Sequence, residues 1–257
     1  MDRGDQAKRT RNENVFNCLY KSPEATFKLI CFPWAGGSSA HFAKWGQDTH
    51  DSLEVHSLRL PGRESRIEEP FANDISQLVD EVVCALQPVI QDKQFAFFGH
   101  SMGAYIAFRT ALHLKENNKP EPLHLFLSSA TPIHVTFPNV NEIRPAEFFP
   151  VLFPHHYHQR SELVAEMDIV SQEVPEALFY VYSSNIPSKA VLACDLTCFV
   201  GSEDIVKDVE AWKDVTSGNT NIHQLPGDHF HLLDPANERL IKNYIIKYLE
   251  VSSLANF

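Results

Sequence analysis

The chain has 257 residues, 44% of them hydrophobic, which suffices for the core of one large α/β domain or two small ones. It carries 22 Lys and Arg against 33 Asp and Glu, and this net charge of −11 argues against sequence-independent binding to nucleic acid or an anionic membrane surface. The five cysteines lack the CxxC pairs of a zinc site, and no apolar run approaches the ~20 residues that span a bilayer. We therefore expect a cytoplasmic protein without a metal ion.

The chain begins with a polar, partly basic stretch, so residues 1–20 are predicted to form a flexible tail. Short apolar runs then alternate with amphipathic segments. The apolar runs, predicted to be strands buried on both faces, are residues 26–32, 53–60, 94–99, 123–129 and 196–201. Residues 73–92 have helical spacing, with Asn73 as N-cap and Pro88 expected to kink the helix or end it early. A last helix follows Asp234, with Pro235 in its first turn.

This order predicts an α/β fold with a mostly parallel, doubly wound sheet, whose reactive groups gather at the carboxyl ends of the strands. One stretch breaks the alternation. Residues 134–182 are rich in Pro, Phe, His and Glu and show no clean period. We interpret them as a lid inserted into a core of residues 21–133 and 183–257.

The motif Gly-His-Ser-Met-Gly at residues 99–103 lies between a predicted strand and an apolar helix that begins near Met102. That context is typical of a nucleophile elbow, a sharp turn that exposes a reactive serine, here Ser101. Both glycines are expected to be necessary, because a Cβ at either would collide with neighbouring backbone. His100 is adjacent to the serine on a tight turn, so we expect it to support the elbow and not to act as the base.

A serine nucleophile needs a base and an orienting acid, which in this layout follow in the order Ser, Asp, His. Asp204 comes directly after the last predicted strand, with Glu203 and Asp208 as rivals. His229 lies in a glycine-containing loop just before the last helix, and we prefer it to His231 as the base.

An oxyanion hole would complete the site. One donor is expected to be the backbone N–H of Met102, which follows the nucleophile. The second is expected from Trp34 or Ala35, in the stretch CFPWAGGSS at residues 31–39, where two glycines let the backbone approach a ligand.

Five segments together resemble the type II thioesterases of fatty acid and polyketide synthases. They are FPWAGGSS (32–39), RLPGRESR (59–66), FFGHSMGAYIAF (97–108), VGSED (200–204) and LPGDHF (225–230). The most discriminating element is LPGRE, because lipases and peptidases of this fold do not usually carry it. Two features depart from the family: Asp228 precedes His229 where Gly is usual, and residues 134–182 lack the usual lid sequences.

The resemblance implies an α/β-hydrolase fold and a cytoplasmic serine hydrolase that needs no cofactor. It implies hydrolysis of acyl thioesters on the phosphopantetheine arm of an acyl carrier protein, with release of medium-chain fatty acids from a fatty acid synthase. The resemblance assigns the roles of nucleophile, acid and base to Ser101, Asp204 and His229.

Substrate recognition adds further candidates. An acidic body that receives an acidic carrier domain needs a local basic surface, for which we expect Arg59, Arg63 and Arg66, although Arg59 and Arg63 are also candidates for buried ion pairs. Phe149 and Phe153 in the insert are expected to line a hydrophobic acyl tunnel, unless they only pack the lid onto the body.

Two other functions stay open at this level. A general carboxylesterase or lipase would use the same triad on oxygen esters, but LPGRE and the missing HGGG-type loop weigh against it. A catalytically impaired member of the fold would bind a synthase partner, with its site blocked by the atypical insert.

Overall fold

The computed structural model describes residues 14–49, 52–70, 72, 75–91, 93–132 and 192–254. Within them, one sheet has the strand order β1-β3-β2-β4-β5-β6-β7, with β1 antiparallel and the other neighbours parallel. The strands are β1 (Phe16–Asn17), β2 (Phe27–Phe32), β3 (Leu53–Leu58), β4 (Gln94–His100), β5 (His124–Ser128), β6 (Asp195–Gly201) and β7 (Thr220–Leu225). The mostly parallel sheet predicted from the sequence is confirmed.

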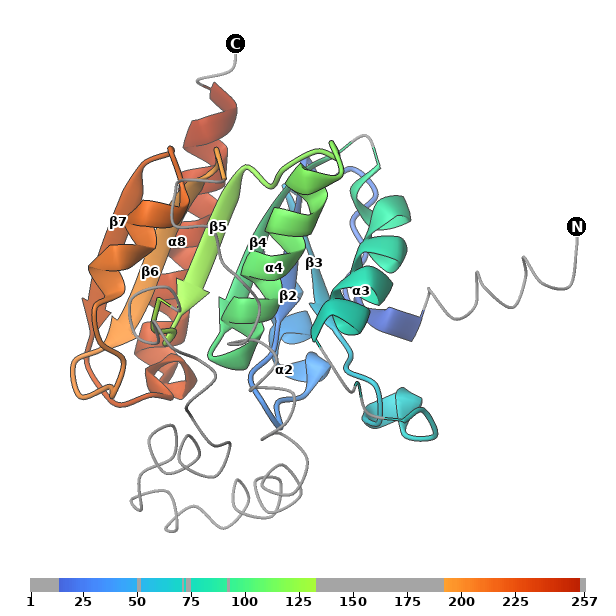
Figure 1. The fold of residues 1–257 in the computed structure, drawn as a ribbon, viewed down its shortest axis with the longest axis horizontal. Helices are drawn as coiled ribbons and strands as arrows, with labels where there is room; N and C mark the ends of the chain where they lie inside the picture. The colour runs from blue at the N-terminus through green and yellow to red at the C-terminus, as the bar shows by residue number, and fades with distance from the viewer. Residues whose placement is uncertain are drawn as a thin grey trace, which may run out of the picture.

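Helices cover both faces of this sheet (Figure 1). The α-helices are α2 (Ser39–Ala43), α3 (Ile75–Ile90), α4 (Met102–Glu116) and α8 (Pro235–Leu254). Short 3₁₀ helices are η1 (Lys44–Gln47), η2 (Glu64–Arg66), η5 (Val209–Val215) and η6 (His231–Leu233). The predicted cap of the last helix is confirmed, because the Asp234 carboxylate accepts the N–H groups of Ala236 (2.8 Å) and Asn237 (3.2 Å).

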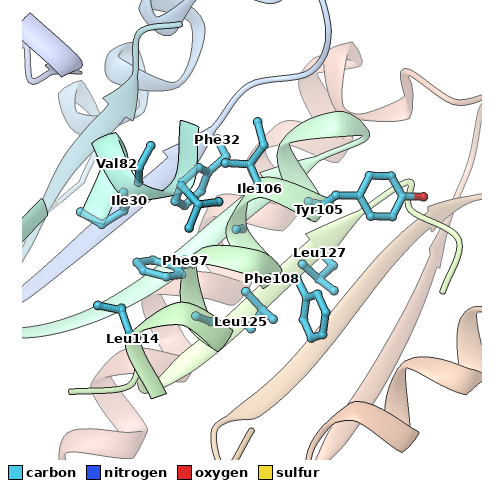
Figure 2. Close-up of a cluster of buried hydrophobic side chains, with 14 of the residues drawn as sticks. Ile30, Phe32, Val82, Phe97, Tyr105, Ile106, Phe108, Leu114, Leu125 and Leu127 are labelled. Carbon is cyan, nitrogen blue, oxygen red and sulfur yellow. The ribbon is translucent and has the colours of Figure 1, made fainter. Parts of the chain in front are cut away.

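Successive strand residues point to opposite faces, so each central strand contributes to two cores. Ile30 and Phe97 belong to the core under α3 and α4, which Figure 2 shows. Their neighbours Leu29 and Phe98 belong to the core under α2 and α8. The near-continuous apolar runs of the sequence follow from this two-sided burial.

The tail expected over residues 1–20 is wrong at its C-terminal end. Phe16 pairs with Leu58 in the β1–β3 ladder, and both Val15 and Phe16 are buried. A two-residue strand is too short to show a period of two, so the sequence pattern gave no sign of it. Residues 1–13 lie outside the described part of the chain.

Strand β7 and the end of α3 also differ from expectation. Strand β7 was not predicted, because as an edge strand it consists mostly of Thr, Asn, His and Gln and is largely exposed. Helix α3 continues past Pro88 to Ile90. Pro88 and Cys84 are both exposed, so the Cys84 carbonyl that loses its helical donor can bond to water instead.

The predicted lid, residues 134–182, lies outside the described residues. On either side of it, β5 and β6 pair directly, from His124 with Asp195 to Ser128 with Phe199. Every described strand of the predicted core therefore belongs to one sheet. In the part of the chain that the structure describes, no helix is long and apolar enough to cross a membrane.

Candidate active site

Ser101 occupies the turn between β4 and α4 with a strained backbone. Its φ is 53° and its ψ is −120°, a conformation that non-glycine residues rarely adopt. The Ser101 N–H donates to the Ser128 carbonyl at 2.8 Å, which ties the turn to β5. Strain of this kind persists only where surrounding structure fixes it, and it gathers at functional sites.

The glycines that flank this turn are required, as the sequence predicted. A Cβ on Gly99 would lie 2.6 Å from the Cα of Ala104 in α4. A Cβ on Gly103 would lie 2.6 Å from the Pro33 carbonyl oxygen, just beyond the end of β2. Both contacts are with backbone atoms, which cannot move aside as the end of a flexible side chain could. The two glycines therefore let α4 pack closely against β4 and β2.

The structure brings Ser101, His229 and Asp204 into one hydrogen-bonded chain. His229 Nε2 lies 3.0 Å from Ser101 Oγ, and His229 Nδ1 lies 3.0 Å from Asp204 Oδ1. A carboxylate only accepts, so Nδ1 carries the proton and the Nε2 lone pair faces the serine hydroxyl. Side-chain exposure is 3% for His229 and 0% for Asp204. This is the arrangement that a general base and its orienting acid require.

The pKa of Asp204 is lowered. Burial alone would raise this pKa, but hydrogen bonds from His229 and Ser129 stabilise the charged form and outweigh burial. The carboxylate is therefore ionised at neutral pH. It can stabilise the imidazolium that forms when His229 accepts a proton.

Ser129 is the residue of this site that the sequence analysis missed. Its hydroxyl donates to Asp204 Oδ2 at 2.6 Å and lies 3.0 Å from the His229 carbonyl oxygen. Its φ of 50° is left-handed, and its N–H donates to the Phe199 carbonyl at 2.9 Å. Its position was the available signal: it directly follows β5, which neighbours the β6 strand that leads to Asp204.

The other two histidines here make different contacts. His231 Nδ1 lies 3.4 Å from Ser129 Oγ, and burial lowers the pKa of its imidazole. His100 is fully buried, and its Nδ1 lies 2.9 Å from Ser128 Oγ. Burial and the neighbouring histidines hold the pKa of His100 well below its usual value, so its ring is neutral. The position of His100 agrees with the expected supporting role.

The remaining acidic candidates lie at the surface. Glu203 and Asp208 are exposed. Asp228 is exposed as well, and its carboxylate accepts the N–H of Phe230 at 2.9 Å. Asp228 therefore closes the turn that carries His229.

The loop expected to complete the oxyanion hole packs beside the elbow. Trp34 and Ala35 are each 7% exposed, and Gly36 has a φ of 79°. The Trp34 ring makes edge contacts with His100 (5.7 Å between centroids) and Phe230 (5.9 Å). On the other side of the elbow, Met102 begins α4, whose first N–H groups have no acceptor within the helix.

The three arginines expected at a docking surface differ in their surroundings. The structure contradicts this role for Arg66, whose side chain is 1% exposed and pairs with Glu69 (2.6 Å) and Glu81 (2.7 Å). Sequence alone could not distinguish a buried guanidinium from an exposed one. Arg59 is half-buried and pairs with Glu64, the alternative that the sequence left open, and Arg63 is half-buried.

One group of potential metal ligands occurs among the described residues, away from the serine. Ligand atoms of Cys18, Glu54 and His56 lie within 4.8 Å of one another. Glu54, however, pairs with the Lys28 ammonium and accepts the Ser22 N–H at 2.5 Å. A buried ammonium thus already supplies the positive charge that the carboxylate needs, and the group is an ion-pair cluster.

Phe149 and Phe153, expected to line an acyl tunnel, lie outside the described residues. Their role stays a prediction.

Comparison with known proteins identifies a family over most of the chain. The family model described as "Thioesterase domain" matches residues 27–248. A human protein named "S-acyl fatty acid synthase thioesterase, medium chain" is 70% identical, with 100% of both chains covered. The rat protein of the same name is 52% identical, with 99% of this chain and 100% of that protein covered.

Solved structures agree with this result. A crystal structure of human thioesterase 2 matches with a TM-score of 0.68 and 62% identity, covering 91% of this chain and 100% of that one. RedJ, a thioesterase of the prodiginine pathway in Streptomyces coelicolor, matches with a TM-score of 0.74 and 26% identity, covering 88% of each chain. The sheet and its two layers of helices therefore form an α/β-hydrolase fold.

Proposed function

The chain belongs to the thioesterase family, and we propose that it is a serine thioesterase releasing medium-chain fatty acids from the acyl carrier protein of a fatty acid synthase. The observation that carries the chemistry is the hydrogen-bonded chain of Ser101, His229 and Asp204 at the carboxyl end of β4. The human and rat relatives support the choice of substrate through their printed names.

Acylation follows from this geometry. Ser101 Oγ attacks the thioester carbonyl carbon while His229 Nε2 accepts its proton. The carbonyl oxygen becomes an oxyanion that accepts hydrogen bonds from the N–H of Met102 and from an N–H at Trp34 or Ala35. The C–S bond then breaks, His229 returns the proton to the sulfur, and the carrier thiol departs from an acyl-enzyme.

Deacylation repeats these steps with water. Water attacks the ester carbonyl carbon as His229 accepts one of its protons. The C–Oγ bond then breaks, the proton returns to Ser101, and the fatty acid leaves. A thiol is a better leaving group than an amine, so this reaction needs less acid catalysis than peptide hydrolysis does.

Carrier binding would use local positive charge on an acidic body. Arg63 follows Gly62 in the loop after β3, is half-buried, and is the preferred candidate for contacting the phosphates or acidic side chains of a carrier domain. A cytoplasmic location is also part of this proposal, and five free cysteines support it.

The test compares three substrate classes with the purified protein. We expect medium-chain acyl thioesters to be hydrolysed faster than p-nitrophenyl esters of the same acids, and acyl carrier protein to give a lower KM than coenzyme A. The Ser101→Ala variant is the control for background hydrolysis. A preference for oxygen esters would indicate an esterase, and failure of a fluorophosphonate to label Ser101 would indicate a blocked site. Either result contradicts the proposal.

A further inference from the structure

The LPGRE segment (residues 60–64) distinguishes this sequence from lipases and peptidases of the same fold. None of its residues belongs to the hydrogen-bonded group of Ser101, His229 and Asp204. It follows β3 and ends in η2. The buried Arg66 closes the segment, because its guanidinium donates to the Arg59 carbonyl at 2.9 Å and its carbonyl accepts the Gly62 N–H at 3.1 Å. These two hydrogen bonds hold the segment in a fixed conformation.

Glu64 has a left-handed backbone inside this segment. Its φ is 53°, which costs free energy in a residue with a Cβ. Such a conformation persists only when surrounding contacts enforce it. The Glu64 side chain provides such contacts, because it forms four hydrogen bonds with other residues.

Three of those hydrogen bonds join Glu64 to the start of α2, and the fourth joins it to Arg59. Oε1 accepts the Ser39 N–H at 2.6 Å and lies 3.2 Å from Ser38 Oγ. Oε2 accepts the Ser39 hydroxyl at 2.6 Å and the Arg59 Nε–H at 3.2 Å. Burial alone would raise the pKa of Glu64, but the bonds from Ser39 and Arg59 outweigh it and hold the pKa below its usual value. The carboxylate is thus ionised when it binds α2.

The oxyanion loop, defined as residues 33–38, connects the end of β2 to the start of α2. At one end the loop is held by β2 in the centre of the sheet. Near its other end are Gly36 and Gly37, which allow the backbone more conformations than other residues do. An N–H that must meet an oxyanion therefore needs a further contact to hold it in position. Ser38, the N-cap of α2, is therefore the second point at which the loop is held, and Glu64 contacts it.

We propose that Glu64 is a positioning residue for catalysis: by binding Ser38 and Ser39 it fixes the oxyanion loop, so that an N–H at Trp34 or Ala35 meets the developing oxyanion. The inference rests on the proposed function, because it assumes that this loop supplies an oxyanion donor. It explains why LPGRE, which contributes no residue to the hydrogen-bonded chain of Ser101, accompanies this chemistry.

The test compares Glu64→Ala and Glu64→Gln with a matched control, Glu121→Gln. Glu121 likewise accepts a backbone N–H, that of Ala193 at 3.0 Å, and pairs with a cation, Lys115 at 3.1 Å, but it precedes β5, at the opposite end of the sheet from Ser101. Loss of one oxyanion donor costs about 10²–10³-fold in kcat, so we expect a loosened loop to cost about 10–100-fold in Glu64→Ala. Glu64→Gln keeps an acceptor for the Ser39 N–H and should lose less. Glu121→Gln should keep its kcat even where its melting temperature falls.

Two further readouts separate positioning from simple stabilisation. The acid limb of the kcat/KM profile should not move in Glu64→Ala, because Glu64 makes its contacts with α2 and not with the base. The rate at which a fluorophosphonate labels Ser101 should fall with kcat, because its phosphonyl oxygen needs the same donors. A lowered melting temperature with unchanged kcat and labelling rate would overturn the inference, as would an equal loss of kcat in Glu121→Gln.

Failure of the proposed function would look different. A wild-type protein that is labelled at Ser101 but hydrolyses no acyl thioester would refute the substrate assignment. The labelling rates of the Glu64 variants would still support or overturn the positioning role.

Discussion

Replacing Ser129 with Ala tests whether the second oxygen of Asp204 is held by the protein. The Ser129 hydroxyl donates to Asp204 Oδ2 at 2.6 Å, and the Asp204 side chain is fully buried. A hydrogen bond to a charged group contributes ~1.5–3 kcal/mol. At roughly 2–4 °C per kcal/mol for a chain of this size, the melting temperature at pH 7 should fall by roughly 3–12 °C.

The pH dependence of this loss has a definite sign. The folded-state pKa of Asp204 lies below its unfolded-state value of about 3.9, so the stability it provides is complete above pH ~4 and is lost as pH falls toward the folded-state pKa. The difference in unfolding free energy between wild type and Ser129→Ala should therefore be constant near neutral pH and shrink as the pH falls through the lowered folded-state pKa of Asp204.

The control for this change is Ser57→Ala. Ser57 is also fully buried, and among the described residues its hydroxyl has no hydrogen-bond partner. Its loss should cost little, because no carboxylate loses a donor. Equal melting temperatures for Ser129→Ala and wild type at pH 7, or a difference that grows as the pH is lowered, would refute the reasoning.

Three further predictions concern catalysis and docking. Ser101→Ala should lower thioester hydrolysis by about 10⁴-fold or more without changing the melting temperature, and residual activity of a few per cent would exclude Ser101 as nucleophile. His229→Ala should be similarly severe and His231→Ala mild in steady-state assays, and the reverse ranking would identify the other histidine as the base. Arg63→Glu should raise KM for acyl carrier protein far more than for acyl-coenzyme A, by a ratio that shrinks with added salt. Equal effects on both substrates would contradict docking at Arg63.

The central strands and the elbow were predictable because their sequence signals are local. An apolar run such as residues 94–99 is readable by itself, and the glycines around Ser101 report backbone contacts that no side chain tolerates. The order Ser, Asp, His then restricts the candidates for the acid and the base to residues that follow Ser101 in the chain. Choosing His229 over His231 from the sequence rested on loop position and resemblance, whereas the distances to Ser101 and Asp204 distinguish the two rings directly.

Features that depend on distant partners were not predictable. Arg66 has the same local sequence signal as an exposed arginine, and its burial depends on Glu81, which α3 supplies. Ser129 looks like any serine after a strand until β6 brings Asp204 beside it. Strand β7 is polar because it lies at an edge, and strand position in a sheet is not encoded in a period of two.

The pairing of β5 with β6 gives the enzyme a property beyond catalysis. Ser101 comes from the part of the chain before residue 132, and Asp204 and His229 from the part after residue 192. The alignment of these two strands helps to bring His229 to a serine 128 residues away. Because such distant pairing is a slow event in folding, recovered turnover marks its completion during refolding. The time course of this strand pairing can therefore be followed in an activity assay, without any attached probe.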